Sequence, residues 1–84
     1  MITESAPCLN RIDVYVGRRL KYRRSAMRLS IDTLSCRAGL SPEQLIRFEE
    51  GVEQISPLGI FQLSHVLEVP IAYFYSVQKN GAVV

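Results

Sequence analysis

The residues of this sequence that are best suited to specific contacts lie between positions 41 and 50. Three of them recur every three residues and carry a hydroxyl, an amide and a guanidinium, which can hydrogen-bond base edges or phosphates: Ser41, Gln44 and Arg47. Their neighbours are apolar or acidic and suit a polyanion poorly: Pro42, Glu43, Ile46 and Glu50. One short stretch therefore offers two kinds of chemistry, one for nucleic acid and one for another partner.

Side chains for catalysis are scarce. His65 is the only histidine, and we interpret it as a polar position on a helix. Cys8 and Cys36 lack the paired spacing of a zinc site, so Cys36 is interpreted as a small helix residue and Cys8 as part of a loose tail. Neither a glycine-rich phosphate loop nor a GxSxG motif occurs. We therefore expect no catalytic residue, no metal, no cofactor and no small-molecule substrate, and the protein is predicted not to be an enzyme.

The composition is that of one small globular domain. The chain has 84 residues, of which 48% are hydrophobic and 21% are charged. No apolar run approaches the roughly 20 residues that cross a bilayer. The start, MITESAPCLN, lacks the basic and then apolar pattern of a signal peptide. We therefore expect no membrane partner and a cytoplasmic location.

The net charge of +2 conceals an uneven distribution of charged residues. Residues 11–28 contain seven basic side chains and one acidic side chain, whereas residues 41–54 contain four acidic side chains and one basic side chain. The basic block either faces solvent or lies near a polyanion, and the acidic block coincides with the stretch described first.

Apolar spacing and boundary signals predict that these blocks lie on short helices. Ile12, Val16 and Leu20 recur every four residues and predict a helix from 11 to about 26 or 27. A second helix follows the capping residue Ser30 and ends at Gly39. The third, from 42 to 50, has Ser41 as its cap, Pro42 in its first turn, Gln44 in a capping box and Gly51 at its end.

Two further segments complete the predicted domain. A fourth helix begins at Ser56 and Pro57 and ends before Pro70, and its inward residues are Ile60, Leu63, Val66 and Leu67. The segment IAYFY is either a short fifth helix, with Ile71 and Phe74 on one face, or an extended piece. We therefore predict an all-α, compact bundle of about five short helices at residues 11–76, with flexible tails at 1–10 and 77–84.

The second and third predicted helices resemble a helix-turn-helix, with small Ser35, Gly39 in the turn and inward Leu45. The wider pattern, "GRRLKYRR", "RLS", "AGLSPEQLIRFEEG" and "ISPLGIFQLSHVLEVPIAYFY", resembles the Cro/C1 or XRE-type regulators, especially short alphaproteobacterial members. The resemblance implies a lambda-repressor-like bundle, often dimeric, that presents its third helix to the major groove. It also implies that Arg24 and Glu49 form a partly buried bidentate clamp between helices rather than a charge kept near the groove.

The resemblance is incomplete on the surface that would meet DNA. Ile31 stands where DNA-reading members commonly have a glutamine, and apolar or acidic residues occupy several reading positions. The turn after the third helix, EEGVEQ, would point Glu50 and Glu53 towards phosphates. Each lost phosphate contact weakens binding and lowers its salt dependence, so these departures argue against tight DNA binding.

Two functional hypotheses follow. The first, which these departures favour, is an antiactivator that sequesters a transcriptional activator protein, similar to quorum-sensing antiactivators of the QseM type. Ile31 and Ile46 are expected to be exposed, and the partner-binding surface would comprise Ile31, Pro42, Glu43, Ile46, Arg47 and Glu50.

The alternative hypothesis is a dimeric DNA-binding repressor of the Cro/C1 type. This repressor would bind DNA bases through Ser41, Gln44 and Arg47. It would contact DNA phosphates through Arg24, Arg28 and Arg37. The homodimer would form through the fifth helix, where Tyr73, Phe74 and Tyr75 offer aromatic surface.

Overall fold

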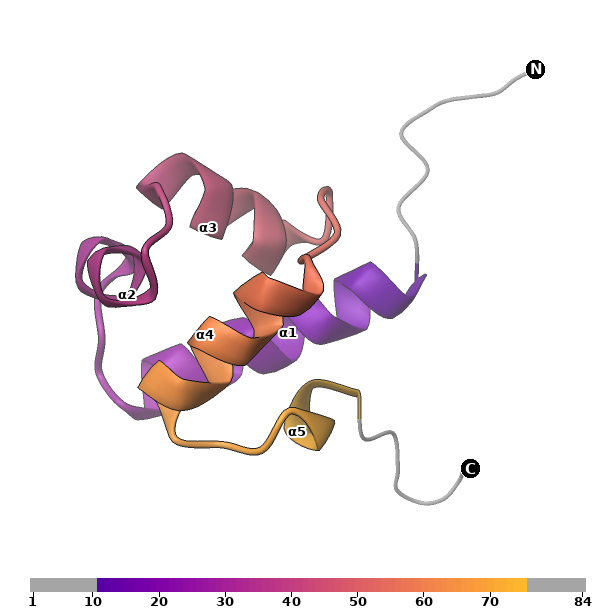
Figure 1. The fold of residues 1–84 in the computed structure, drawn as a ribbon. Coiled ribbons are helices and arrows are strands. Elements are labelled where there is room, and N and C mark those ends of the chain that lie inside the picture. Colours follow the sequence, from indigo (N-terminus) through magenta and orange to yellow (C-terminus); the bar gives the residue numbers. More distant parts are fainter. Residues whose placement is uncertain (1–10, 76–84) are drawn as a thin grey trace.

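The computed structural model describes residues 11–75, and these form five helices (Figure 1). In chain order they are α1 (Arg11–Ala26), α2 (Ile31–Ala38), α3 (Pro42–Glu50), α4 (Pro57–Leu67) and α5 (Ala72–Tyr75). The all-α prediction is confirmed, as is the helical alternative for the fifth segment. None of the described helices combines the length and apolarity that a membrane crossing needs. The predicted tails at 1–10 and 77–84, with Cys8, lie outside the described residues.

Local side-chain chemistry sets the helix boundaries as predicted. Three serines cap helices by accepting a backbone N–H bond from the third residue along: Ser30 from Thr33 at 3.0 Å, Ser41 from Gln44 at 3.1 Å and Ser56 from Gly59 at 3.1 Å. Gly39 and Gly51 end α2 and α3 in the left-handed conformation, at φ of 73° and 78°. These caps keep the turns short, so that only residues 39–41 separate α2 from α3.

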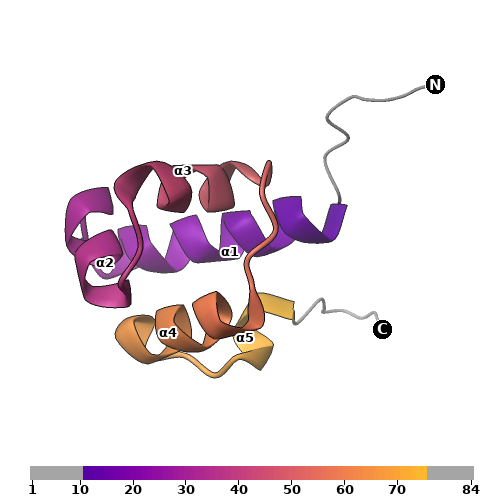
Figure 2. The same cartoon turned by 45° about the horizontal axis from the view of Figure 1, so that its top comes forward.

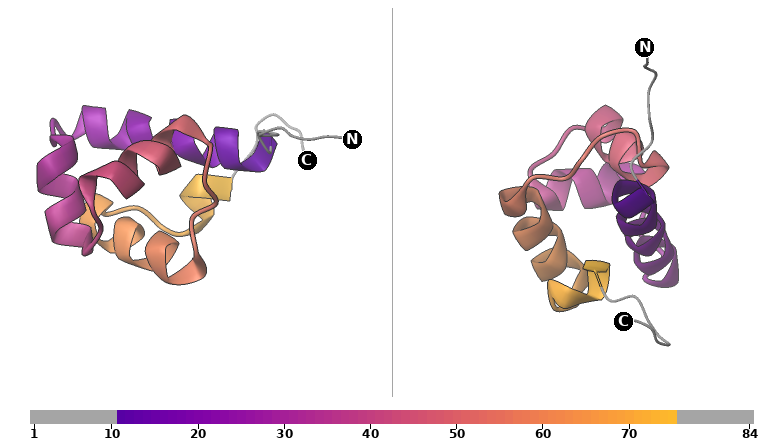
Figure 3. Two further views of the ribbon diagram at one scale, coloured as in Figure 1. Left: turned by 90° about the horizontal axis from the view of Figure 1, so that it is seen from above. Right: turned by 90° about the vertical axis from the view of Figure 1, so that its right-hand side faces the viewer.

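A single core draws side chains from every helix, because no helix of this length is stable alone in water. Its buried hydrophobic residues are Val16, Leu20, Leu34, Ala38, Leu45, Phe48, Ile55, Ile60, Leu63, Leu67 and Phe74. In Figure 2, α3 lies on one side of α1, whereas α4 and α5 lie on the opposite side of α1. Figure 3 shows α2 closing one end of this arrangement. The core thus fixes α2 and α3 relative to α1.

A glycine lets α1 and α3 approach each other closely. A Cβ atom on Gly17 would lie 2.8 Å from the carbonyl oxygen of Glu49 and still closer to that of Phe48. Both obstacles are backbone atoms of α3, which cannot move aside as a side chain can. The absence of a side chain at Gly17 therefore sets the spacing between α1 and α3.

Two arginines of α1 attach the C-terminal part of the fold. Arg19 Nε donates to the Tyr73 carbonyl at 2.9 Å, and its guanidinium carbon lies 3.9 Å from the Tyr73 ring centroid. The Tyr73 hydroxyl donates in return to the Arg19 carbonyl at 3.1 Å. Arg23 Nε donates to the carbonyl of Leu67 at 3.0 Å, where α4 ends. These basic residues are therefore structural and do not belong to a freely solvated basic face.

The prediction that three consecutive aromatic residues are available on the fifth helix is wrong. Phe74 is fully buried in the core and Tyr73 is half-buried against Arg19. Tyr75 alone of the three is exposed. Ile71, predicted to share one face of the fifth helix with Phe74, precedes the helix and is exposed. The core takes Phe74 because α5 packs against α1, a contact that a local pattern does not reveal.

Candidate nucleic-acid interface

The helices α2 and α3, with the turn between them, form a helix-turn-helix. Leu34, Ala38 and Leu45 are buried on its inner side. The turn is closed by a backbone bond of 2.8 Å from the Leu40 N–H to the Ser35 carbonyl. Ser35 is small enough to be buried at this crossing, and its hydroxyl donates to the Asp32 carbonyl at 3.0 Å. One side of α3 is thereby fixed against the core and the opposite side faces outward.

The outward side of α3 brings together the residues predicted from the sequence. Ser41, Pro42, Glu43, Ile46, Arg47 and Glu50 are exposed, and Gln44 is half-buried. Glu43, Ile46 and Glu50 recur at three- and four-residue spacing and lie along one flank of the helix. Gln44 and Arg47 lie along the other flank. The hydrogen-bonding groups and the apolar and acidic groups are therefore adjacent but separable.

A largely buried ion pair anchors the far side of α3. Arg24 Nε and Nη2 donate to the two carboxylate oxygens of Glu49 at 2.6 and 3.1 Å. Arg24 Nη1 donates to the Leu29 carbonyl at 2.9 Å. The two side chains are only 14% and 7% exposed. The predicted clamp between α1 and α3 is confirmed, and it commits the Arg24 guanidinium to the interior.

Glu53 makes contacts that the sequence analysis did not anticipate. One of its carboxylate oxygens accepts a bond of 2.7 Å from Arg47 Nε, and the other accepts a bond of 3.3 Å from Gln44 Nε2. The hydrogen bond from Arg47 and then that from Gln44 hold the pKa of Glu53 below its usual value of 4.5. Gly51 ends α3 in its left-handed conformation, but the glycine in the sequence indicates only that the chain turns there, not that Glu53 lies beside Gln44 and Arg47.

The predicted exposed patch loses one member. Ile31 is half-buried and packs against the core, as Met27 and Leu29 do, so the expectation that it is exposed is wrong. Ile31 is the first residue of α2, and its side chain turns towards the core. Ile46 is 42% exposed, as expected.

Two of the arginines predicted for phosphate contacts are accessible. Arg28 follows α1, is exposed and has a left-handed backbone with φ of 58°. Arg37 is exposed in the last turn of α2.

Cys36 and His65 occupy helix positions, as predicted, and both are exposed. The centroid of the His65 ring lies 4.7 Å from that of the Phe61 ring. Residues 11–75 contain no group of three or more potential metal ligands.

These features define a helix-turn-helix protein, and comparisons with known proteins agree. The chain is 36% identical over 73 residues to a protein of Rhodospirillum rubrum described as an uncharacterized transcriptional regulator in the ATPase CF(0) region, covering 87% of this chain and 68% of that protein. It is 33% identical over 66 residues to the HTH-type transcriptional regulator y4aM of Sinorhizobium fredii, covering 79% of this chain and 46% of that protein. The chain spans about half the length of its Sinorhizobium relatives. No family model matches it.

A solved structure has the same fold. The restriction-modification controller protein C.AhdI from Aeromonas hydrophila is 29% identical in sequence and superposes with a TM-score of 0.72, over 74% of this chain and 94% of that chain. The chain belongs to the Cro/C1 (XRE) family of helix-turn-helix transcriptional regulators. Because its relatives are regulators, it is a transcriptional regulator and not an enzyme, as predicted.

Proposed function

We propose that this regulator binds duplex DNA sequence-specifically with the outward side of α3, as a repressor of the Cro/C1 type. The observation that carries the proposal is the fixed presentation of Gln44 and Arg47 by a helix that the Arg24–Glu49 clamp and the core hold in place. Preorganised side chains lose less entropy when they meet a base edge. The relatives support the proposal because both are described as transcriptional regulators, and y4aM is described as one of the HTH type.

Phosphate contacts would come from the edges of the motif. Arg28 and Arg37 are exposed and basic. In the first turn of α3 only the Glu43 N–H could add a backbone donor, because Pro42 has none and the Gln44 N–H is bound by Ser41. Glu43 and Glu50 oppose this attraction, since both are exposed on the same helix. We therefore expect weak binding to arbitrary DNA and a strong dependence on the correct sequence. Such a regulator would act in the cytoplasm.

A gel shift at low salt tests the proposal directly. Purified protein is titrated onto duplexes selected from a randomised pool and onto its own promoter. We expect retardation that weakens with added salt and is lost in Arg47→Ala. Arg18→Ala is the matched control, because it removes one exposed positive charge from α1, outside the helix-turn-helix. Absence of any retardation, or equal loss in both variants, would refute sequence-specific binding by α3.

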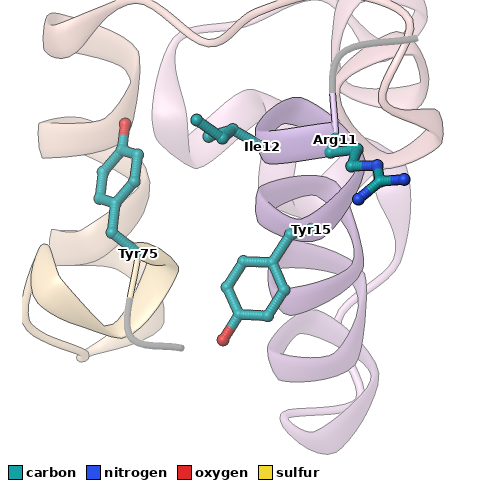
Figure 4. A pocket seen from close by; sticks show the side chains of 4 residues that line it. All are labelled: Arg11, Ile12, Tyr15 and Tyr75. Atoms are coloured by element: carbon teal, nitrogen blue, oxygen red, sulfur yellow. The ribbon is translucent and has the colours of Figure 1, made fainter. Parts of the chain in front are cut away.

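The proposed repressor is a homodimer that uses the surface beside α5. A hollow of about 340 Å³ lies there and is lined by Arg11, Ile12, Tyr15 and Tyr75, the side chains labelled in Figure 4. Ile12 and Tyr75 are 61% and 48% exposed there. A dimer would place two copies of α3 in half-sites about one helical turn apart. Sedimentation equilibrium of wild type and Tyr75→Glu tests this, and a dimer that survives the substitution would place the contact elsewhere.

The second candidate function is sequestration of a transcriptional activator protein, as a quorum-sensing antiactivator. The observation that favours it is the 42% exposure of Ile46 on a flank that it shares with Glu43 and Glu50. An exposed apolar residue with a charged rim is a common feature of protein-binding surfaces. Pro42 and Arg47 would complete the contact, whereas Ile31 could add only the exposed part of its side chain.

The two candidate functions respond differently to one substitution. Ile46→Asp should abolish co-purification with a neighbouring transcription factor if sequestration is the function, with the helical circular dichroism unchanged. Gln44→Ala lies on the other flank of α3 and should leave that complex intact. A complex that tolerates Ile46→Asp would rule out this surface, and a complex that requires Gln44 would place the contact on the flank proposed for DNA.

A further inference from the structure

The side chains proposed to read DNA share one intramolecular partner. Glu53 lies beyond α3 and accepts hydrogen bonds from Arg47 at 2.7 Å and from Gln44 at 3.3 Å, using a different oxygen for each. Its side chain is 34% exposed and that of Arg47 is 49% exposed. A carboxylate near a DNA-binding surface has an obvious cost, because it repels phosphates. Its position between two polar side chains of α3 suggests a compensating role.

The geometry of the ion pair leaves the reading end of Arg47 available. Glu53 engages the Nε–H of Arg47, and the two terminal nitrogens carry the remaining donors of the planar guanidinium. A pair of terminal N–H groups matches the O6 and N7 acceptors of guanine in the major groove. Fixing the guanidinium through Nε removes rotamer freedom that the side chain would otherwise lose on binding.

We infer that Glu53 is a positioning residue for sequence readout, which orients Arg47 so that its terminal nitrogens meet a guanine in the major groove. The inference rests on the proposed DNA-binding function and adds its base preference. Glu53 lowers the affinity for DNA of any sequence and raises the discrimination for sites with guanine at the position facing Arg47. Gln44, held by the same carboxylate, is directed towards an adjacent base.

A simpler role for Glu53 makes a different prediction. If Glu53 acts only as a negative charge, its removal strengthens binding to all duplexes equally and leaves discrimination unchanged. Glu50 supplies the control for this role, because it is an exposed carboxylate at the end of α3. Glu50→Gln and Glu53→Gln each remove one negative charge, but only the second replaces the carboxylate that Arg47 contacts.

The experiment measures dissociation constants for a selected duplex, for the same duplex with the preferred guanine replaced, and for unrelated DNA of equal length. Wild type is compared with Glu50→Gln, Glu53→Gln, Glu53→Ala, Arg47→Ala and the double variant Glu53→Ala/Arg47→Ala. All measurements use one salt concentration, because phosphate contacts depend strongly on it.

We expect Glu53→Ala to bind unrelated DNA more tightly than wild type while its preference for guanine falls by roughly tenfold, the order of magnitude of one bidentate base contact. Glu53→Gln should fall between the two, and Glu50→Gln should keep the wild-type preference. Adding Arg47→Ala to Glu53→Ala should cost little further discrimination, since the two residues act together. A preference in Glu53→Ala that equals that of Glu50→Gln would overturn the inference and leave DNA binding intact.

A measurement without DNA tests the contact between Glu53 and Arg47 separately from DNA binding. In wild type, the Hε proton of Arg47 should give a nuclear magnetic resonance signal that exchanges slowly with solvent, and Glu53→Ala should lose it. An Hε proton that exchanges as fast as that of exposed Arg18 would refute the positioning contact itself. A protected Hε proton in a protein that binds no duplex at low salt would instead refute the proposed function, and with it the readout role of Glu53.

Discussion

Breaking the Arg24–Glu49 pair should be among the most destabilising single changes in this domain. Glu49 is 7% exposed and accepts two of the hydrogen bonds that Arg24 donates. Glu49→Ala leaves the Arg24 side chain, which is 14% exposed in the intact pair, with the Leu29 carbonyl as its remaining described partner. Removing one partner of a buried pair costs about 3–5 kcal/mol. The lower end is expected here, about 3 kcal/mol, because Arg24 retains that bond and some access to water.

Urea denaturation followed by circular dichroism at 222 nm would measure this loss. A domain of this size has a free energy of unfolding of only about 3–10 kcal/mol, so a loss of 3 kcal/mol should lower the melting temperature by roughly 12–24 °C. Glu49→Gln retains the shape and part of the hydrogen bonding, and should cost about 1–2 kcal/mol.

The paired replacement Arg24→Met with Glu49→Leu provides the control. It removes both charges together, and buried ion pairs replaced by apolar residues are often close to neutral. The double variant should therefore be more stable than Glu49→Ala. A loss below about 1 kcal/mol in Glu49→Ala, within the range of exposed ion pairs, would show that the pair is not a structural clamp.

Three further predictions concern single positions. Gly17→Ala should destabilise the fold by about 3 kcal/mol or more in the same urea assay, because its Cβ would meet the α3 backbone. Gly39→Ala should cost only about 1–2 kcal/mol, because its Cβ has open space and only the φ of 73° is unfavourable. Equal losses of stability in the two variants would contradict this distinction. Glu68→Gly should raise the melting temperature by a few degrees relative to Glu68→Ala, because Glu68 caps α4 with a left-handed φ of 59°; identical melting curves would refute it. The lowered pKa of Glu53 means that its bond to Arg47 persists at neutral pH and is lost only as the pH falls through a value below 4.5; a carboxyl titration by nuclear magnetic resonance should show this midpoint rising in Arg47→Ala.

The helices were predictable because their boundaries depend on neighbours in the sequence. Ser41 and Pro42 begin α3 and Gly51 ends it through interactions within a few residues. The clamp between Arg24 and Glu49 was also anticipated, but through the family resemblance. Interactions between residues within one helical turn can therefore be predicted from the sequence alone.

The contacts that were missed join residues that are distant in sequence or follow a turn whose direction the sequence leaves open. Arg19 and Tyr73 are separated by 54 positions and meet only because α5 returns to α1. The sequence predicts that Phe74 contributes aromatic surface to a dimer. A run of three aromatic residues is too short to show the helical spacing that would indicate which of them faces inward. The sequence predicts that Glu53 points towards phosphates, because Gly51 marks the end of α3 without giving the direction of the chain that follows.

The return of α5 to α1 also has a consequence for the order in which the domain assembles. Of the five described helices, α1 leaves the ribosome before the others. Leu20, however, shares its core with Phe74 and Arg19 is held by Tyr73, and these partners are synthesised more than 50 positions later. Translation adds about 5–20 residues per second, so α1 spends a few seconds without these partners. Its apolar stripe is then open to chaperones and proteases, and cooperative folding is completed only after Tyr75 has emerged.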